Sequence, residues 1–247
     1  MEISSNNPYF FSLENKGKLL FYLGIKHSWD PADPQFDFIK AKWGEFLSSA
    51  KNPLVVVESH NWKVYDTETE AISKGGEIDF MAYLCDQKNI PISCFEPDRG
   101  SEMNFLLKQF SKEQVEYYYF ARNVSQWHRL TQKPDIDPYL LSFLQRDKKV
   151  SGWDDFVFSI DHMKEIHRQF FGTELNFSDA EFFKKIENPT REDNPFKDLV
   201  RASGSYRDQT VVKNIKNVWD QDKDLFVIYG RGHALNHERL LRDFNKI

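Results

Sequence analysis

The chain has 247 residues, with 33 basic and 38 acidic side chains, so its formal net charge is −5. A nucleic-acid-binding domain usually carries a basic stripe, and this charge balance argues against such a partner. Hydrophobic residues make up 40% and charged residues 29%, as in globular proteins, so we expect neither a disordered chain nor a fibrous repeat. No apolar run approaches the roughly 18–20 residues that span a bilayer.

The cellular compartment is predicted from the N-terminus and the cysteines. Residues 1–8 contain neither the basic nor the apolar region of a signal peptide. Cys85 and Cys94 form no CxxC pair, and two cysteines in a chain of this length are typical of a reducing compartment. We therefore expect a cytoplasmic protein without a membrane partner.

Four short apolar runs predict buried strands, because each is bounded by a chain breaker or a polar residue. In chain order they are Leu19–Ile25, Leu54–Val57, Ile90–Phe95 and Leu225–Tyr229. Apolar residues spaced three or four apart predict helices over Phe36–Leu47, around residues 80–84 and, at the end, over about Leu235–Phe244. Strands that alternate with helices indicate an α/β layer structure.

The middle of the chain has helical patterns and only weak strand signals. Capping boxes that start at Ser111 and Ser178 mark two helix N-termini. Apolar residues over Phe156–Phe171 recur at helical spacing, and the Pro-containing stretches Thr131–Pro138 and Asn188–Pro195 are predicted to be exposed loops. We expect one domain over residues 1–247 with a helical insertion at about 101–190.

The two ends of the chain repeat one short pattern, an apolar strand followed by Gly-x-x-His. The first copy is Gly24 to His27 and the second is Gly230 to His233. In an open α/β sheet, ligands bind beyond the carboxyl ends of the strands, where glycine allows a sharp turn. Both histidines are therefore predicted to face such a crevice, whereas the alternative is a pair of ordinary loop or core histidines.

Acidic residues stand at the matching places on the other two strands. Glu58 follows the second strand and Glu96 follows the third. A carboxylate beside a buried strand is costly to desolvate without a partner, so it marks either a functional site or a structural ion pair, here with Arg99 or Arg207. Imidazoles and carboxylates together can bind a divalent metal or activate a water molecule.

In this order, the motifs resemble the superfamily that joins TraB/GumN proteins, Tiki metalloproteases, erythromycin esterases and ChaN-like haem-binding proteins. Arg207-Asp208 is similar to the Arg-Asn/Asp pair that precedes a late helix in that superfamily. The resemblance implies a central mixed sheet flanked by helices. It also implies hydrolysis in some branches, by metal-bound water in the Tiki-like proteins and by His/Glu-activated water in the esterases. The chain departs from the esterase pattern Gly-Glu-x-x-His, because residue 25 is Ile.

The sequence thus predicts a hydrolase that cleaves an ester or peptide bond in a small-molecule or peptide substrate. The enzyme is expected to be either metal-dependent and protease-like, or esterase-like. We expect His27, His233 and Glu58 to bind a divalent metal (Zn, Mn or Co) or to orient a water. Glu58 or Glu96 is the expected general base. Arg207 is expected to stabilise developing negative charge.

Two further arginines, Arg99 and Arg231, are expected to bind an anionic group of the substrate, with a plain salt bridge as the alternative for Arg99. The main alternative function is a non-catalytic haem- or small-ligand-binding protein of the ChaN type, whose many aromatic residues would line an apolar pocket. An effector or scaffold protein with a decayed site is a third hypothesis.

Overall fold

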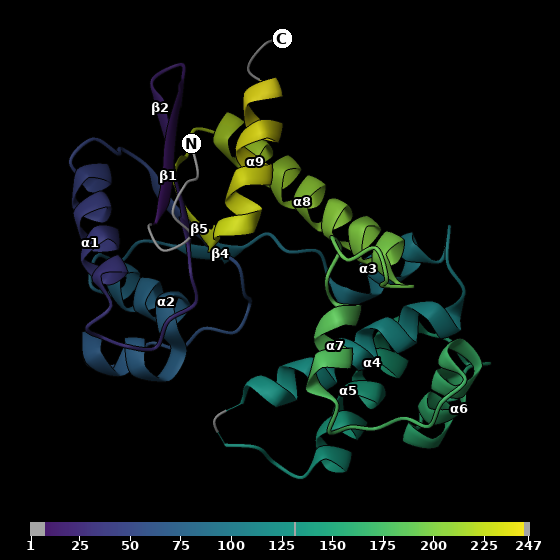
Figure 1. The fold of residues 1–247 in the computed structure, drawn as a ribbon. Helices are drawn as coiled ribbons and strands as arrows, with labels where there is room; N and C mark the ends of the chain where they lie inside the picture. Colours follow the sequence, from purple (N-terminus) through teal and green to yellow (C-terminus); the bar gives the residue numbers. More distant parts are fainter. Residues whose placement is uncertain (1–7, 131, 245–247) are drawn as a thin grey trace. The chain divides into compact units, whose positions relative to one another are not determined.

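The computed structural model describes residues 8–130 and 132–244. The predicted absence of a signal peptide concerns residues 1–8, which lie almost wholly outside this part, as does Thr131 of one predicted loop. The chain divides into two compact units (Figure 1). We call them the sheet unit, Met1–Glu96 with Asp208–Ile247, and the helical unit, Pro97–Arg207. The division falls within one helix, α8 (Lys197–Asp220).

The sheet unit is built on a mixed sheet of five strands within the described residues, in the order β1-β2-β5-β3-β4. The strands are β1 (Tyr9–Asn15), β2 (Lys18–Ile25), β3 (Pro53–Val57), β4 (Ile92–Cys94) and β5 (Asp224–Gly230). All neighbouring pairs are parallel except β1 and β2. The four predicted strands and the α/β class are confirmed, although β4 is shorter than its apolar run.

The sequence prediction missed β1. It forms a hairpin with β2, and Lys16 and Gly17 between them have φ angles of 51° and 75°. Positive φ at both central residues is what a two-residue turn of type I′ requires. This antiparallel edge strand makes an otherwise parallel sheet mixed.

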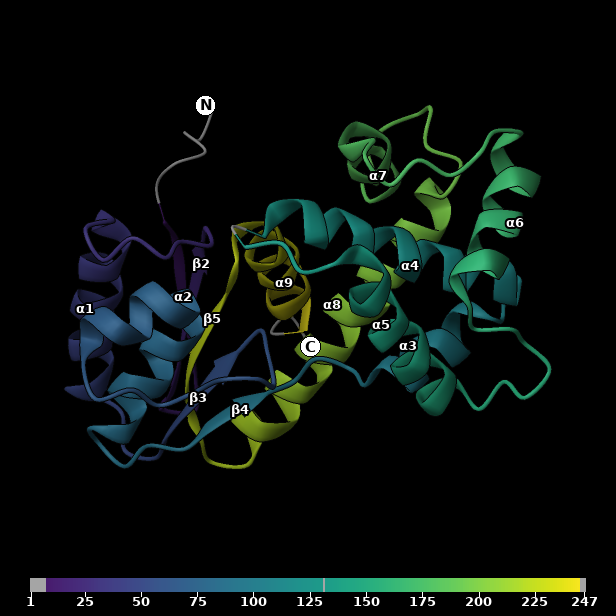
Figure 2. The same cartoon turned by 90° about the horizontal axis from the view of Figure 1, so that it is seen from below.

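Helices cover both faces of the sheet, so its parallel strands are continuous apolar runs rather than alternating ones. On one face, α1 (Pro34–Leu47) and α2 (Glu68–Asp86) pack on a core that includes Phe21 and Phe226. On the other face, α9 (Arg231–Phe244) and the part of α8 from Asp208 onward pack on a core that includes Tyr22 and Val227. Figure 2 shows α1 and α2 on one side of the strands and α9 on the other.

The helical unit has its own apolar core, which includes Tyr117, Phe120 and Met163. Besides the first part of α8, its helices are α3 (Arg99–Leu106), α4 (Lys112–Arg129), α5 (Ile136–Ser151), α6 (Ile160–Phe171) and α7 (Ala180–Ile186). None of the helices in the described residues is both long and apolar enough to cross a membrane.

The helix N-termini of this unit can be compared with the predicted capping boxes. The capping box at Ser111 is confirmed, with both of its hydrogen bonds present at the start of α4. The prediction at Ser178 is wrong by one residue, because Asp179 is the N-cap and accepts a hydrogen bond from the Phe182 N–H. The predicted helix from Phe156 begins only at Ile160, where the Ser159 side chain caps its first turn.

Candidate active site

Three strand ends bring predicted residues to one edge of the sheet. In the parallel registers Ile25 pairs with Gly230, and Val57 pairs with Ile228. Residues that follow these strands therefore leave the sheet at its carboxyl edge, which is where ligands bind in open α/β sheets. His27, Glu58 and His233 all start from this edge.

The first Gly-x-x-His motif does not contain the predicted turn. Gly24 lies inside β2, where it pairs with Tyr9 of β1 and with Tyr229 of β5. A Cβ atom at this position would lie 2.6 Å from the Cβ of Ala234 in α9. Glycine is needed here because α9 packs closely on the strand, and the chain leaves the strand only after Ile25.

The second motif differs, because α9 begins at Arg231 rather than near Leu235 as predicted. Gly230 ends β5, and His233 stands in the first turn of the helix. The Gly230 N–H donates a 2.7 Å hydrogen bond to Oε2 of Glu58. A carboxylate at a helix N-terminus is stabilised by the helix dipole, so this contact fixes Glu58 beside His233.

The His233 imidazole is held by Asp208, the first residue of the sheet unit in α8. Nδ1 of His233 lies 2.6 Å from Oδ1 of Asp208. Burial raises the pKa of Asp208, but the hydrogen bonds from His233 and His237 outweigh it and place that pKa below its usual value. Asp208 is therefore an ionised acceptor, so the neutral His233 ring carries its proton on Nδ1. Nε2, which can then accept a proton, lies 3.7 Å from Oε1 of Glu58.

A second histidine completes a buried network on the same carboxylate. Nε2 of His237 lies 3.1 Å from Oδ1 of Asp208, and its Nδ1 lies 2.5 Å from the Tyr22 hydroxyl. Burial, and then the charges of Tyr229, Glu58, Asp208 and Glu96, raise the pKa of Tyr22 well above its usual value. Tyr22 thus stays protonated and donates to His237, which donates to Asp208. We call Tyr22, His237, Asp208 and His233 the Asp208 network.

Sequence reasoning missed most of the Asp208 network. The signal for His237 was available, because it stands four residues after His233 and thus on the same face of a helix. Asp208 was noted only as part of the Arg207-Asp208 pair that resembles the superfamily motif, and no role was predicted for it. No sequence signal distinguishes Tyr22 from the other residues of the apolar run that forms β2.

His27 is also held by a carboxylate that the sequence did not predict. Its Nδ1 lies 2.5 Å from Oε1 of Glu77 in α2, and 57% of the His27 side chain is exposed against 7% for Glu77. Glu77 directly follows Gly76, whose φ of 65° kinks α2. The kink favours glycine, because its φ is positive and a Cβ at Gly76 would lie only 3.0 Å from the carbonyl oxygen of Ser28.

Asp208, His233 and His237 form a group that could hold a metal ion, since one ligand atom of each lies within 4.8 Å of the others. It shares only His233 with the predicted set of His27, His233 and Glu58. Two imidazoles and one carboxylate suit zinc, whose tetrahedral ligands at about 2.0–2.1 Å lie roughly 3.4 Å apart. The 2.6 Å between Nδ1 of His233 and Oδ1 of Asp208 is instead a hydrogen-bond length.

Two other predicted residues belong to the sheet unit. Glu96 follows β4, and its backbone oxygen lies 3.4 Å from Nε2 of His60. The Glu96 carboxylate is near enough to Tyr22 to contribute to its raised pKa. Arg231 begins α9 and is partly exposed.

The two remaining arginines belong to the helical unit. Arg207 stands in α8 directly before Asp208. Arg99 begins α3, and its guanidinium carbon lies 3.8 Å from the centre of the Tyr119 ring. Its Nε lies 3.9 Å from Oδ1 of the buried Asp147. The salt bridge that was the alternative for Arg99 thus has a partner within its own unit.

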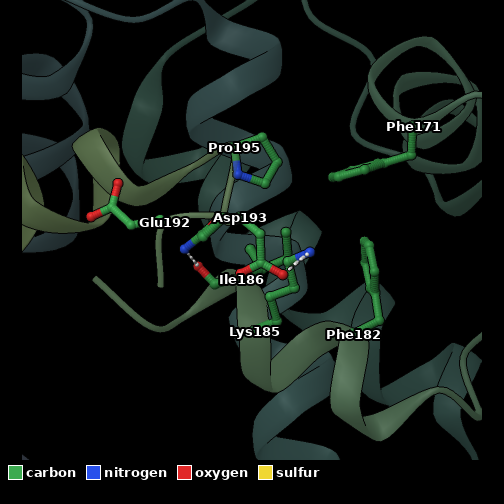
Figure 3. Close-up of a pocket in the computed structure, with 8 residues that line it drawn as sticks. Phe171, Phe182, Lys185, Ile186, Glu192, Asp193 and Pro195 are labelled. Atoms are coloured by element: carbon green, nitrogen blue, oxygen red, sulfur yellow. Dashed lines mark hydrogen bonds and ion pairs between the residues drawn. The ribbon is translucent and has the colours of Figure 1, made fainter. Parts of the chain in front are cut away.

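The helical unit contains an aromatic cavity of about 340 Å³ (Figure 3). The rings of Phe171 and Phe182 stand close together on one side, and Glu192 points away from them. Lys185 and Asp193 form a 2.8 Å ion pair at the cavity. Among the described residues that line it there is no His, Cys, Met or Tyr, which are the side chains that ligate haem iron. The cavity therefore suits a small apolar ligand better than haem.

No family model matches the chain, and neither the curated proteins nor the solved structures compared with it give a match. Function must therefore be inferred from the geometry of the site. An imidazole with one nitrogen held by an ionised carboxylate and the other facing a second carboxylate has the arrangement of a general base.

Proposed function

We propose that the protein hydrolyses an ester or amide bond with a water molecule that His233 activates as general base. The observation that carries this proposal is the position of His233 between two carboxylates, with Nδ1 bound to Asp208 and Nε2 3.7 Å from Oε1 of Glu58. That gap is longer than a hydrogen bond, and one water can contact both atoms. Such a water donates one O–H to Nε2 and the other to Oε1, so its lone pair is directed at a substrate.

The proton transfers balance without a further reactant. Nε2 of His233 takes a proton as the water oxygen bonds to the carbonyl carbon, and Asp208 stabilises the imidazolium that forms. The imidazolium then gives its proton to the leaving oxygen or nitrogen as the bond to the carbonyl carbon breaks. The products are an acid and an alcohol or amine.

His27 is proposed as a second imidazole for the substrate. Glu77 binds its Nδ1, and in the protonated ring the Nε2–H is proposed to donate a hydrogen bond to the reacting carbonyl or the leaving group. Glu96 shapes the charge at the same edge of the sheet. The order of the motifs, similar to that in the TraB, Tiki and erythromycin esterase superfamily, supports hydrolysis.

The test is hydrolysis of a panel of p-nitrophenyl esters and anilides by the wild type, His233→Ala and a control, His162→Ala in the helical unit. We expect wild-type turnover that falls by about 10²–10⁴-fold in His233→Ala, because the general base is lost. His162→Ala should keep full activity. Thermal unfolding verifies that both variants fold. Full activity in a folded His233→Ala protein, or no wild-type turnover on the whole panel, would overturn the proposal.

A second candidate function, small-ligand binding without chemistry, is favoured by the aromatic cavity of the helical unit. Phe171 and Phe182 offer two apolar rings, and pockets for small ligands are mostly apolar. Addition of haem should give no shifted Soret band, since the cavity offers no axial ligand among its described residues. A naphthalene probe should bind, and Phe182→Ala should weaken its binding. A shifted Soret band would instead support the haem-binding alternative.

A further inference from the structure

The sheet unit contains a larger cavity, of about 530 Å³, between the loop that follows β3 and helix α2. We call it the β3–α2 cavity. It is lined by His60, Asn61, Trp62, Lys63, Tyr65, Lys74, Gly75, Ile78 and Asp79. Its volume falls within the range of roughly 300–1,000 Å³ that small-molecule sites occupy.

Some residues that line this cavity are adjacent in sequence to residues of the proposed active site. The loop that forms one wall starts directly after Glu58, and Ile78 in the other wall directly follows Glu77, the partner of His27. His60 of the lining contacts the backbone oxygen of Glu96. The cavity and the proposed active site therefore share two elements, the segment after β3 and helix α2.

The cavity combines aromatic and cationic side chains. Trp62 and Tyr65 are both partly buried lining residues, and a partly buried aromatic side chain loses little freedom on binding. Lys74 lies 5.3 Å from the centre of the Tyr65 ring and forms a 2.8 Å ion pair with Glu70. Among the described residues, Lys63 has no ion-pair partner for its ammonium group. Lys63 is thus the lining lysine whose ammonium group is not engaged in an ion pair within the described part of the chain.

The acidic lining residue has a structural task. Oδ1 of Asp79 accepts a 2.9 Å hydrogen bond from the Lys63 backbone N–H, and Asp79 is 6% exposed. Its carboxylate occupies the space beside Gly75, where a Cβ would lie 1.7 Å from Oδ2. Asp79 therefore anchors the loop at Lys63, whose side chain is exposed.

We propose that the β3–α2 cavity binds the substrate through an aromatic group that carries one negative charge, such as an aromatic carboxylate. The ring stacks on Trp62 and Tyr65, and the carboxylate pairs with Lys63. As an assignment of the substrate class, this inference rests on the proposed hydrolase function, but ligand binding can be measured without catalysis.

The experiment compares 2-naphthoate with the neutral 2-naphthalenemethanol by isothermal titration to the full chain. We expect the wild type to bind the carboxylate at least about tenfold more tightly, which is about 1.4 kcal/mol. Lys63→Gln should remove this preference, and Trp62→Ala should weaken binding of both probes. Lys88→Gln, which changes an exposed lysine just after α2, is the matched control and should behave as the wild type.

The outcomes separate this inference from the proposed function. Equal binding of the two probes, or an unchanged preference in Lys63→Gln, overturns the assignment of the cavity. Retained naphthoate binding in His233→Ala supports a binding site that is independent of the general base. Ester turnover without naphthoate binding or inhibition rejects the cavity alone, whereas naphthoate binding without turnover of any ester rejects the hydrolase and leaves the binding site.

Discussion

The Tyr22 hydroxyl lies 2.5 Å from Nδ1 of His237, and neither side chain has any exposed surface. These residues are 215 positions apart in the chain, one in β2 and the other in α9. The bond fixes the tautomer of His237, so that its Nε2–H points at Asp208. A hydroxyl in the core of the sheet unit thereby helps to orient the carboxylate that holds His233.

Replacement of Tyr22 by Phe should destabilise the protein by about 1–3 kcal/mol, because Nδ1 of His237 is left buried without a donor. Urea unfolding measures the change. Tyr119→Phe is the control, since the buried Tyr119 hydroxyl has no hydrogen-bond partner among the described residues and should be dispensable. Equal losses in the two variants would contradict the role given to the Tyr22 hydroxyl.

Asp208→Asn should lower kcat for ester hydrolysis by about 10²–10⁴-fold with little change in KM, because the amide cannot stabilise the His233 imidazolium. Steady-state kinetics measure both constants. Asn236→Ala is the matched control, since Asn236 binds the other oxygen of Asp208, Oδ2, at 2.9 Å. A rise in KM with an unchanged kcat would place Asp208 in substrate binding rather than in the orientation of His233.

Treatment with a chelator should leave hydrolysis unchanged. The prediction follows from the proposed mechanism, in which Asp208 holds His233 and His237 by hydrogen bonds of 2.6 Å and 3.1 Å and His233 alone activates the water. Mass spectrometry of the purified protein and of His237→Ala measures the metal content. A stoichiometric divalent ion that is lost in His237→Ala, together with activity that returns on addition of Zn²⁺, would assign these residues to a metal centre instead.

Gly24→Ala should destabilise the sheet unit by about 1–3 kcal/mol, because the added methyl group would overlap Ala234 in α9. Gly44→Ala is the control, since a Cβ there meets nothing within 4 Å and alanine is the better helix former in α1. The double variant Gly24→Ala/Ala234→Gly should recover part of the lost stability. Denaturant unfolding measures this recovery. No recovery would mean that the crowding lies elsewhere, for example at Tyr9.

Glu116→Gln should make stability less dependent on pH. Glu116 is fully buried, neither of its carboxylate oxygens has a hydrogen-bond partner among the described residues, and burial followed by the charge of Asp147 raises its pKa well above 4.5. Because the folded pKa exceeds the unfolded one, the protonated carboxyl stabilises the fold below pH 4.5. That contribution is lost as the pH rises toward the folded pKa.

Urea unfolding at several pH values between 4 and 8 should therefore show the wild type losing up to about 1.4 kcal/mol per pH unit relative to Glu116→Gln. The comparison between the two proteins cancels the other titrating groups. Parallel stability curves would mean that Glu116 titrates alike in the folded and unfolded chains.

The strands and their ends could be predicted from the sequence for a simple physical reason. Parallel strands that are covered on both faces are short continuous apolar runs, so a segment such as Leu225–Tyr229 is recognised without any alternation of polar and apolar residues. His27, Glu58 and His233 follow such runs closely, so their place at one edge of a parallel sheet could be anticipated. The edge strand β1 was not predicted, because one of its faces is only partly covered and its apolar pattern is broken.

The pairing of these side chains was decided only by the tertiary structure. The strand order places β2, near the start of the chain, beside β5, near its end, and α8 and α9 then pack on the same face. Asp208, Tyr22 and Glu77 come from three different elements, and local sequence carries no record of contacts between residues so far apart. Local sequence thus identifies the side chains at the sheet edge, whereas long-range packing selects the carboxylate that holds each histidine.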